Sequence, residues 1–308
     1  MKKIIGFIGF GEASYHICRG LKDENIQGVI AYDVLLGTDR KDAITAMEKR
    51  AAETTVSLVH SMDSVMKADI VFLGVPAKFA ESATMEALPF MTEDKLYIDI
   101  TTNRPVIKEK LGQIMKDKGL AYVDASVMGA VPLYKHKTPT LICGSGAKKM
   151  QEILGPIGMD LTYVGETAGR AVKMKLTRSI FIKGIEALTL EMLLTARKLD
   201  IEDDIMAGLH KSFEIQGFTK MVGQLVTSNV IHSARRAIEA DECIELINDS
   251  GFDPVMMRAA KEKLEWSANL GFTKLCPVPD CKNFTDLYAL WEQQGICMND
   301  SKGETHHD

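Results

Sequence analysis

Residues 165–199 read GETAGRAVKMKLTRSIFIKGIEALTLEMLLTARKL, and the character of the chain changes across this stretch. Before it, short apolar runs alternate with helical segments, whereas only helical segments follow it. The stretch has no proline and is dense in good helix formers, so we expect a helix longer than the roughly 8–20 residues usual in globular proteins. With about 100° per residue, Lys175, Arg178 and Ser179 share one side of this helix, and Lys173 points away from them.

Upstream of this helix, the apolar runs have the length and flanking glycines of buried strands. We expect strands in residues 3–9, 28–33, 56–59, 69–76, 95–102, 120–127, 140–145 and 161–166. Helical segments separate most of them, and strands that alternate with helices predict a parallel sheet with right-handed crossovers. Downstream we expect helices around 168–199, 201–213, 218–247, 254–269 and 282–295, with Asp253 as N-cap and Pro254 as first residue of the fourth.

Composition limits the kind of protein this is. The chain has 308 residues, 46% of them hydrophobic, which predicts two globular domains. A net charge of −5 without long basic runs argues against a nucleic-acid partner, and without about 18 uninterrupted apolar residues we expect no membrane span and a cytoplasmic protein. The six cysteines are scattered, so we expect reduced thiols; Cys276 and Cys281 match no standard zinc spacing, and we expect no metal.

A glycine motif directly follows the first expected strand and precedes a helix. It reads Gly9-Phe10-Gly11-Glu12-Ala13-Ser14, or G-x-G-x-x-S. The first glycine permits the tight turn, the second lets the backbone approach a pyrophosphate, and a small third residue allows helix and strand to pack closely. The motif predicts a dinucleotide site, with Gly9, Gly11, Glu12, Ala13 and Ser14 near the cofactor. We therefore expect an α/β fold: an N-terminal Rossmann-type doubly wound parallel sheet in residues 1–166, followed by an all-α C-terminal domain in 167–308.

Asp33 ends the second expected strand, 24 residues after Gly9. A carboxylate at about this spacing accepts hydrogen bonds from the ribose 2′-hydroxyl and repels a 2′-phosphate, which favours NAD over NADP. Two alternatives stay open, since Asp33 could simply cap the next turn and Arg40 with Lys41 could accept NADP. Further cofactor contacts are expected at the ends of the later strands, from Val75, Pro76 and Thr102. For Val75-Pro76 the alternative that the pair simply ends a strand stays equally open.

Lys175 is the candidate catalytic residue. A cofactor that takes hydride from a hydroxyl carbon requires a base for the hydroxyl proton. A lysine can serve if burial or a neighbouring positive charge lowers its pKa from about 10.4. Lys175 follows the nucleotide domain directly, and Lys173, about 200° away on the same helix, cannot face the same site.

These stretches resemble the β-hydroxyacid dehydrogenases, the family of 6-phosphogluconate and 3-hydroxyisobutyrate dehydrogenases. GFIGFGEAS is similar to the family's N-terminal fingerprint. Its aspartate and serine–glycine–glycine turn correspond to residues 124–130, DASVMGA, with Met128 in place of the serine and Ala130 in place of a glycine. Its glycine, lysine and asparagine motif corresponds to Gly169, Lys175 and Ser179, with Ser179 in place of the asparagine.

The stretches VMGAVP, KLTRSIFIKGIEAL and HSARRAIE resemble a branch of this family whose C-terminal domain has no determined function. The resemblance implies an NAD(P)-dependent oxidoreductase that moves hydride between a small, anionic 3-hydroxy acid and nicotinamide, with Lys175 as general acid/base. It implies substrate contacts from Ser126, Met128, Gly129, Arg178 and Ser179, and, together with the long apolar helix, a homodimer. The altered motif positions leave open an imine or keto reductase with another proton donor, and a non-catalytic NAD(P)-sensing protein.

Other cationic groups have weaker claims to a substrate. His232, Arg235, Arg236 and Glu239 lie at helical spacing, and we expect a salt-bridged surface or interface there more than an anion site. Lys135 and His136 follow the VMGAVP turn, where loop cations are usually solvated.

Overall fold

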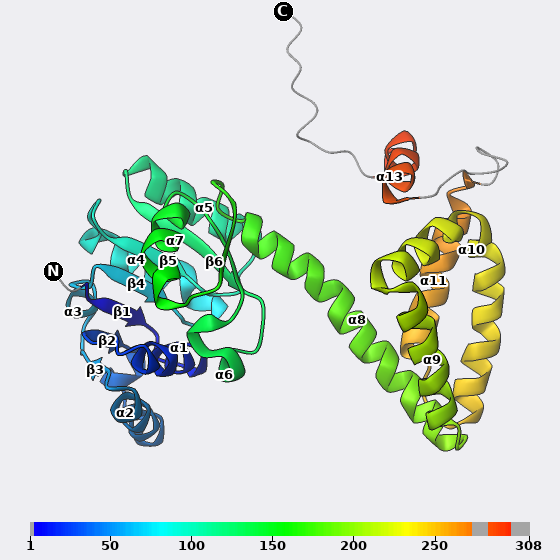
Figure 1. Ribbon diagram of the computed structural model, residues 1–308, viewed down its shortest axis with the longest axis horizontal. Helices are drawn as coiled ribbons and strands as arrows, with labels where there is room; N and C mark the ends of the chain where they lie inside the picture. The colour runs from blue at the N-terminus through cyan, green and yellow to red at the C-terminus, as the bar shows by residue number, and fades with distance from the viewer. Residues whose placement is uncertain (1–2, 273–282, 297–308) are drawn as a thin grey trace, which may run out of the picture. The chain divides into compact units, whose positions relative to one another are not determined.

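The computed structural model describes residues 3–272 and 283–296, and the chain divides into two compact units, Met1–Ile180 and Phe181–Asp308 (Figure 1). The first unit is α/β and the second is helical, which confirms the predicted fold class. The division lies inside one long helix, α8 (Arg170–Lys198), whereas we expected it at residues 166/167, before the helix begins. Cys276, Cys281 and Cys297 lie outside the described residues.

One eight-stranded sheet forms the centre of the first unit, in the order β3-β2-β1-β4-β5-β6-β7-β8. The strands are β1 (Ile5–Ile8), β2 (Val29–Tyr32), β3 (Ser57–Leu58), β4 (Ile70–Leu73), β5 (Leu96–Asp99), β6 (Ala121–Val127), β7 (Thr140–Cys143) and β8 (Leu161–Gly165). The pairs from β3 through to β6 are parallel. The chain order reverses between β1 and β4, which is where doubly wound sheets open a crevice for ligands.

Helices cover both faces of this sheet. They are α1 (Glu12–Asp23), α2 (Lys41–Thr54), α3 (Met62–Val65), α4 (Ala80–Ala87), α5 (Pro105–Asp117), α6 (Val131–Tyr134) and α7 (Ala147–Leu154). Side chains of α1, α2 and α7 pack with Phe7 of β1 in one core cluster. Side chains of α3, α4 and α5 pack with Ile8, the next residue of β1, in the other. Because both faces are buried, the central strands are continuous apolar runs rather than alternating ones.

The sheet departs from the all-parallel prediction at one pair, because β6 and β7 are antiparallel. The connection between them carries α6 and the short turn η4 (Lys135–Lys137), which pack against α1 at the carboxyl edge of the sheet instead of crossing to the opposite edge. Gly20 of α1 makes room for this packing, since a Cβ there would lie 2.0 Å from Nδ1 of His136. The chain therefore turns back at the carboxyl edge, and β7 begins opposite Val127.

This reversal determines where α8 starts. β7 pairs with the second half of β6, so that Cys143, its last residue, lies opposite Asp124. β8 runs parallel to β7 and ends level with Cys143. As a result, α8 begins beside Asp124, close to the carboxyl end of β5.

The second unit contains α9 (Glu202–Gln216), α10 (Phe218–Asp249), α11 (Val255–Asn269) and α13 (Phe284–Gln293), besides the later part of α8. The expected start of α11 was wrong by one residue, because Pro254 is the N-cap and Asp253 pairs with Arg258 instead of capping. The cap comes from α8, where the Glu191 carboxylate accepts hydrogen bonds from the N–H groups of Met256 and Met257 at 2.8 and 2.9 Å.

Within the described ranges, none of the helices combines the length and the apolar character needed to cross a membrane. The same ranges contain no group of three or more His, Cys, Asp or Glu side chains placed to hold a metal ion.

Candidate active site

The loops that follow β1, β4, β5 and β6 lie side by side at one edge of the sheet. These strands are consecutive neighbours and run parallel, so their carboxyl ends meet at the same edge. The glycine motif follows β1, Val75 and Pro76 follow β4, Thr102 follows β5, and Met128 follows β6. The residues expected near a cofactor and a substrate are therefore brought to one edge by the topology.

The glycine loop leaves space above the start of α1. Gly9 has a φ of +86°, and a Cβ there would lie 2.7 Å from the carbonyl oxygen of Gly74. Gly11 is the N-cap of α1, where no side chain caps the helix and a Cβ would meet nothing within 4 Å. The N–H groups of Glu12 and Ala13 in the first turn are thus available to an anion, as dinucleotide binding requires.

Ser14 closes the packing between α1 and the sheet. Its side chain is fully buried, and its hydroxyl donates a 2.8 Å hydrogen bond to the carbonyl oxygen of Gly9. A Cβ on Gly74 would lie only 2.4 Å from the Ser14 Oγ. Ser14 therefore does more than fill the small-residue position of the motif, because it also holds the first glycine in place.

Asp33 carries out the turn-capping role left open above. Its Oδ1 accepts the N–H of Leu35 at 3.0 Å, which caps the short helix η1 (Val34–Gly37). Its Oδ2 accepts the N–H of Phe10 at 2.9 Å, which ties the glycine loop to the end of β2. Each carboxylate oxygen has further acceptor capacity, so these two bonds do not prevent Asp33 from also accepting a ribose hydroxyl. Arg40 and Lys41 are exposed at the start of α2.

The loops after β4 and β5 place the other expected cofactor contacts, which differ in how far they are exposed. Val75 is half-buried and packs on the second core cluster, whereas Pro76 is exposed and precedes the short helix η2 (Ala77–Phe79). Thr102 is exposed after β5, and its Oγ1 accepts a 2.8 Å hydrogen bond from the Nζ of Lys175. Lys175 thus reaches from the second turn of α8 to the carboxyl end of β5.

Lys173 has a different environment. Its Nζ forms a 2.6 Å ion pair with Glu109 of α5, and its side chain is largely exposed. Lys175 is half-buried, and its pKa lies below the ordinary lysine value because of desolvation and, secondly, the positive charge of Lys108, whereas Asp124 acts in the opposite direction. A lowered pKa brings a lysine closer to the deprotonated state that a general base requires.

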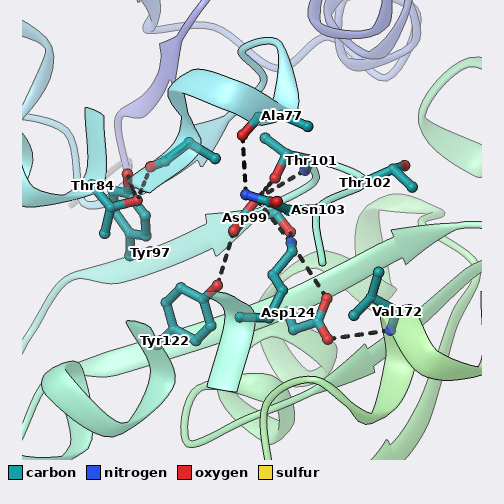
Figure 2. A network of polar contacts seen from close by, with 12 residues as sticks. Ala77, Thr84, Tyr97, Asp99, Thr101, Thr102, Asn103, Tyr122, Asp124 and Val172 are labelled. Carbon is teal, nitrogen blue, oxygen red and sulfur yellow. Dashed lines mark hydrogen bonds and ion pairs between the residues drawn. The ribbon is translucent and has the colours of Figure 1, made fainter. Parts of the chain in front are cut away.

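The ends of β5 and β6 carry two buried aspartates that share one buried lysine (Figure 2). Lys108 of α5 has no exposed surface, and its Nζ lies 2.9 Å from Oδ1 of Asp99 and 3.4 Å from Oδ1 of Asp124. The Tyr122 hydroxyl donates to Oδ2 of Asp99 at 2.9 Å. The backbone N–H and the hydroxyl of Thr101 donate to Oδ1 of Asp99 at 2.9 and 2.6 Å.

Asp124 connects this group to α8. Its Oδ2 accepts hydrogen bonds from the N–H group of Gly169 at 3.0 Å and from that of Val172 at 3.3 Å, the second of which is drawn in Figure 2. These bonds satisfy two N–H groups at the start of α8. The Cys143 thiol lies 3.4 Å from the same oxygen, and burial with this carboxylate raises its pKa to about 12. Cys143 is therefore protonated near neutral pH and acts as a hydrogen-bonding group.

Neither Lys108 nor Asp99 was among the residues singled out from the sequence. Lys108 does share a helical face with Leu111 and Met115, three and seven residues later, and both are buried. This spacing was the available signal, although a lysine on an apolar face usually extends its amine to solvent.

The expected substrate contacts differ in accessibility. Ser126 is buried, and its hydroxyl has no hydrogen-bond partner within the described chain, so a substrate reaches it only if neighbouring groups move. Met128 is half-buried and Gly129 exposed after β6. Arg178 is exposed and Ser179 half-buried on the face of α8 that carries Lys175, and Arg178 makes no ion pair with the described parts of the chain.

The other cationic side chains considered as substrate contacts mostly bind groups of the protein itself. His136 is buried against α1, with Nε2 3.0 Å from the carbonyl oxygen of Ile157, and Lys135 pairs with Asp23 at 2.6 Å. In α10, Arg235 pairs with Glu239 and Arg236 donates to Ser228 at 2.8 Å. His232 is half-buried on the same helix. These arrangements favour the structural interpretation of both groups.

Comparison with known sequences identifies the first unit. Residues 4–165 match the family described as the NAD-binding domain of 6-phosphogluconate dehydrogenase, which spans more than half of the chain. The chain belongs to this 6-phosphogluconate dehydrogenase family. Its Rossmann domain is thus an NAD-binding domain, as the glycine motif predicted, and residues 196–267 match a domain of unknown function, DUF1932, which confirms the branch suggested by the C-terminal stretches.

Further relatives and solved structures support the fold. The 2-(hydroxymethyl)glutarate dehydrogenase of Eubacterium barkeri is 28% identical over 178 residues, which are 55% of this chain and 56% of that protein. A conserved hypothetical protein from Sinorhizobium meliloti 1021 is 29% identical, with a TM-score of 0.59 and coverage of 96% and 97% of the two chains. An imine reductase from Myxococcus stipitatus in complex with NAD+ has a TM-score of 0.70 at 16% identity, covering 94% and 99%, which shows a shared fold.

Proposed function

We propose that this protein transfers hydride between a small, anionic 3-hydroxy acid and nicotinamide, with Lys175 as the general acid/base. The observation that carries the proposal is the position of Lys175, a half-buried residue whose Nζ lies 2.8 Å from the Thr102 Oγ1 at the carboxyl edge of the NAD-binding sheet. The lowered pKa of this amine supports a base at that place.

In the oxidation, the substrate carbon loses a hydride and its hydroxyl loses a proton, so that a carbonyl forms. NAD+, when bound, accepts the hydride. The neutral amine of Lys175 accepts the hydroxyl proton and becomes an ammonium, and the reverse reaction returns the proton to the carbonyl oxygen. The hydroxyl of Thr102 orients the amine, because it accepts a hydrogen bond from one N–H of Lys175. The nitrogen lone pair then points away from Thr102 and is free to accept a proton.

The substrate's carboxylate requires its own partner. Arg178 is one turn beyond Lys175 on the same helical face, is exposed, and has no carboxylate partner in the part of the chain that is described. A guanidinium presents two parallel donors to a carboxylate. We therefore assign the carboxylate to Arg178, with Ser179 and the backbone at Met128 and Gly129 as further polar contacts.

Replacement of Lys175 by methionine tests the proposal, with Lys173→Met as the matched control on the opposite side of the helix. Turnover of NAD+ with a panel of 3-hydroxy acids is expected to fall at least about 100-fold in the first variant, the range of general-base effects, and to stay near wild type in the second. NADH binding, followed by fluorescence, should be similar in both. Near-normal turnover in the Lys175 variant, or loss in the Lys173 variant, refutes the assignment.

A second candidate function is reduction of an imine or ketone with another proton donor. The observation that favours it is the combination of Met128 and Ser179 at positions where the dehydrogenases have serine and asparagine. NADPH- or NADH-dependent reduction of cyclic imines, retained in Lys175→Met, distinguishes this reaction from the first. Cofactor binding without turnover of acids, ketones or imines indicates an NAD-sensing protein.

We also propose that the protein is a homodimer with a small-molecule substrate. α8 exposes large apolar side chains, with Ile180 at 76%, Leu190 at 59% and Leu194 at 51% exposed, and at about 100° per residue these three share one side of the helix. A contiguous exposed apolar stripe of this kind often marks a protein–protein contact. Light scattering at micromolar concentration should give about twice the 34.0 kDa chain mass, and a monomer would contradict this proposal.

A further inference from the structure

The most unusual feature outside the proposed chemistry is the buried lysine of α5. Lys108 is fully enclosed, and its ammonium donates to the carbonyl oxygen of Asp99 at 2.9 Å besides facing the carboxylates of Asp99 and Asp124. Both carboxylates are themselves fully buried. Charged groups are rarely enclosed unless they are paired, and here one cation is shared by two anions from neighbouring strands.

The two carboxylates hold different parts of the site. Asp99 accepts the N–H and the hydroxyl of Thr101, which fixes the loop that continues into Thr102. Asp124 accepts the N–H groups of Gly169 and Val172, which fixes the first turn of α8. Lys175 donates a hydrogen bond to Thr102 from the next turn of that helix. Asp99 therefore holds the loop of the acceptor, Thr102, and Asp124 holds the helix of the donor, Lys175.

We propose that Lys108 is a positioning residue of the active site, which joins Asp99 to Asp124 and thereby fixes the amine of Lys175 against Thr102. This inference rests on the proposed function of Lys175. It assigns Lys108 a role without contact to substrate or cofactor.

The arrangement has an electrostatic consequence as well. The charged groups that act on Lys175 are Lys108 from α5 and Asp124 from β6, while the loop after β5 presents the neutral hydroxyl of Thr102. Lys108 favours the deprotonated amine and Asp124 opposes it, and the effect of Lys108 is the larger. Removal of the Lys108 charge should therefore make Lys175 titrate at higher pH.

The test measures Lys175 itself, in the full-length chain. Wild type, Lys108→Met and Lys108→Arg are labelled with trace acetic anhydride from pH 7 to 11, and tandem mass spectrometry follows Lys175 separately from Lys173. Exposed Lys49 of α2 is the internal reference. We expect the titration midpoint of Lys175 to rise by about one pH unit in Lys108→Met, a tenfold change in the deprotonated fraction at fixed pH. Lys108→Arg, which keeps the charge, should titrate near wild type.

Lys108→Met leaves two buried carboxylates without their cation, so a second variant guards against misfolding. In Lys108→Met/Asp124→Asn the asparagine oxygen still accepts from Gly169 and Val172, while both charges that act on Lys175 are gone. Its midpoint should lie between those of wild type and Lys108→Met. A midpoint that coincides with wild type in a folded charge-removal variant, or that moves as far in Lys108→Arg as in Lys108→Met, overturns the proposal.

Turnover supplies the second readout. With a 3-hydroxy acid and NAD+, the acidic limb of the kcat/KM profile should move upward with the labelling midpoint in Lys108→Met. The two failures are distinguishable, because absent turnover in wild type contradicts the proposed function while the labelling of Lys175 still decides the role of Lys108.

Discussion

The contact between Gly74 and Ser14 yields a prediction whose sign and size follow from the geometry. A Cβ on Gly74 would lie 2.4 Å from the Ser14 Oγ, whereas its next neighbours, the Gly9 carbonyl oxygen and Ile100 Cδ1, lie at 3.5 Å. Gly74→Ala should therefore destabilise the first unit by about 2 kcal/mol through overpacking. Ser14→Ala removes one buried hydrogen bond, to Gly9, and should cost about 1 kcal/mol.

The double variant separates this contact from a general loss of stability. Without the Ser14 hydroxyl, the new methyl group on Gly74 has ordinary contacts, so Ser14→Ala/Gly74→Ala should cost about 1 kcal/mol instead of the additive value of about 3 kcal/mol. Urea unfolding followed by tyrosine circular dichroism reports on the first unit, since six of the seven tyrosines precede residue 181 and both tryptophans follow it. Additive costs would refute the reasoning, and tryptophan fluorescence should show an unchanged second unit.

Three further predictions concern other parts of the molecule. Asp33→Asn removes the charge that repels a 2′-phosphate, so the affinity for NADPH relative to NADH should rise about tenfold in fluorescence titrations. Burial lowers the pKa of His136, so the folded protein keeps it neutral while the unfolded chain takes up a proton below about pH 6.5. Stability from this residue is thus present above that pH and is lost as the pH falls, and the melting temperature between pH 7 and 5 should fall more in wild type than in His136→Gln. Glu191→Ala removes both capping bonds to α11 and should cost the second unit about 2 kcal/mol, read by tryptophan fluorescence.

Each of these has a clear contrary result. An unchanged cofactor ratio in Asp33→Asn would mean that its bonds to Phe10 and Leu35 are its whole role. Parallel melting curves for wild type and His136→Gln would show that other groups govern the acid response. A loss of the tyrosine signal together with the tryptophan signal in Glu191→Ala would show that the damage is not confined to the second unit.

The features recovered from the sequence are those set by local pattern. Apolar runs between glycines located the strands, and the glycine motif located the dinucleotide loop, because each depends on a few adjacent residues. The 100° rotation per residue predicted that Lys175 and Lys173 face different sides of the helix. In the structure Lys175 donates to Thr102, and Lys173 pairs with Glu109. The catalytic role of Lys175 stays a prediction.

The features missed depend on residues far apart in the chain. The burial of Lys108 requires carboxylates from two other strands, and no local pattern in α5 reveals them. The connection into the antiparallel β7 packs its His136 against Gly20, more than 100 residues earlier in the chain. Likewise, α11 is capped by Glu191 of another helix, so the local Asp253-Pro254 signal misplaced its start by one residue.

The reversal of β7 and β8 has a consequence for how this protein can be recombined with its relatives. Because α8 begins beside Asp124, its first turns, with Lys175 and Arg178, belong to the cofactor unit although they are continuous with the helical one. A chimera joined after residue 180 would keep Asp124, Thr102 and Lys175 of this chain together and exchange the helices beyond them. A chimera joined at residue 166 would instead replace α8, including Lys175, by the helix of the relative. That helix would then have to pack against the native Asp124 and Thr102. The first compact unit therefore ends inside α8, about three helical turns after that helix begins.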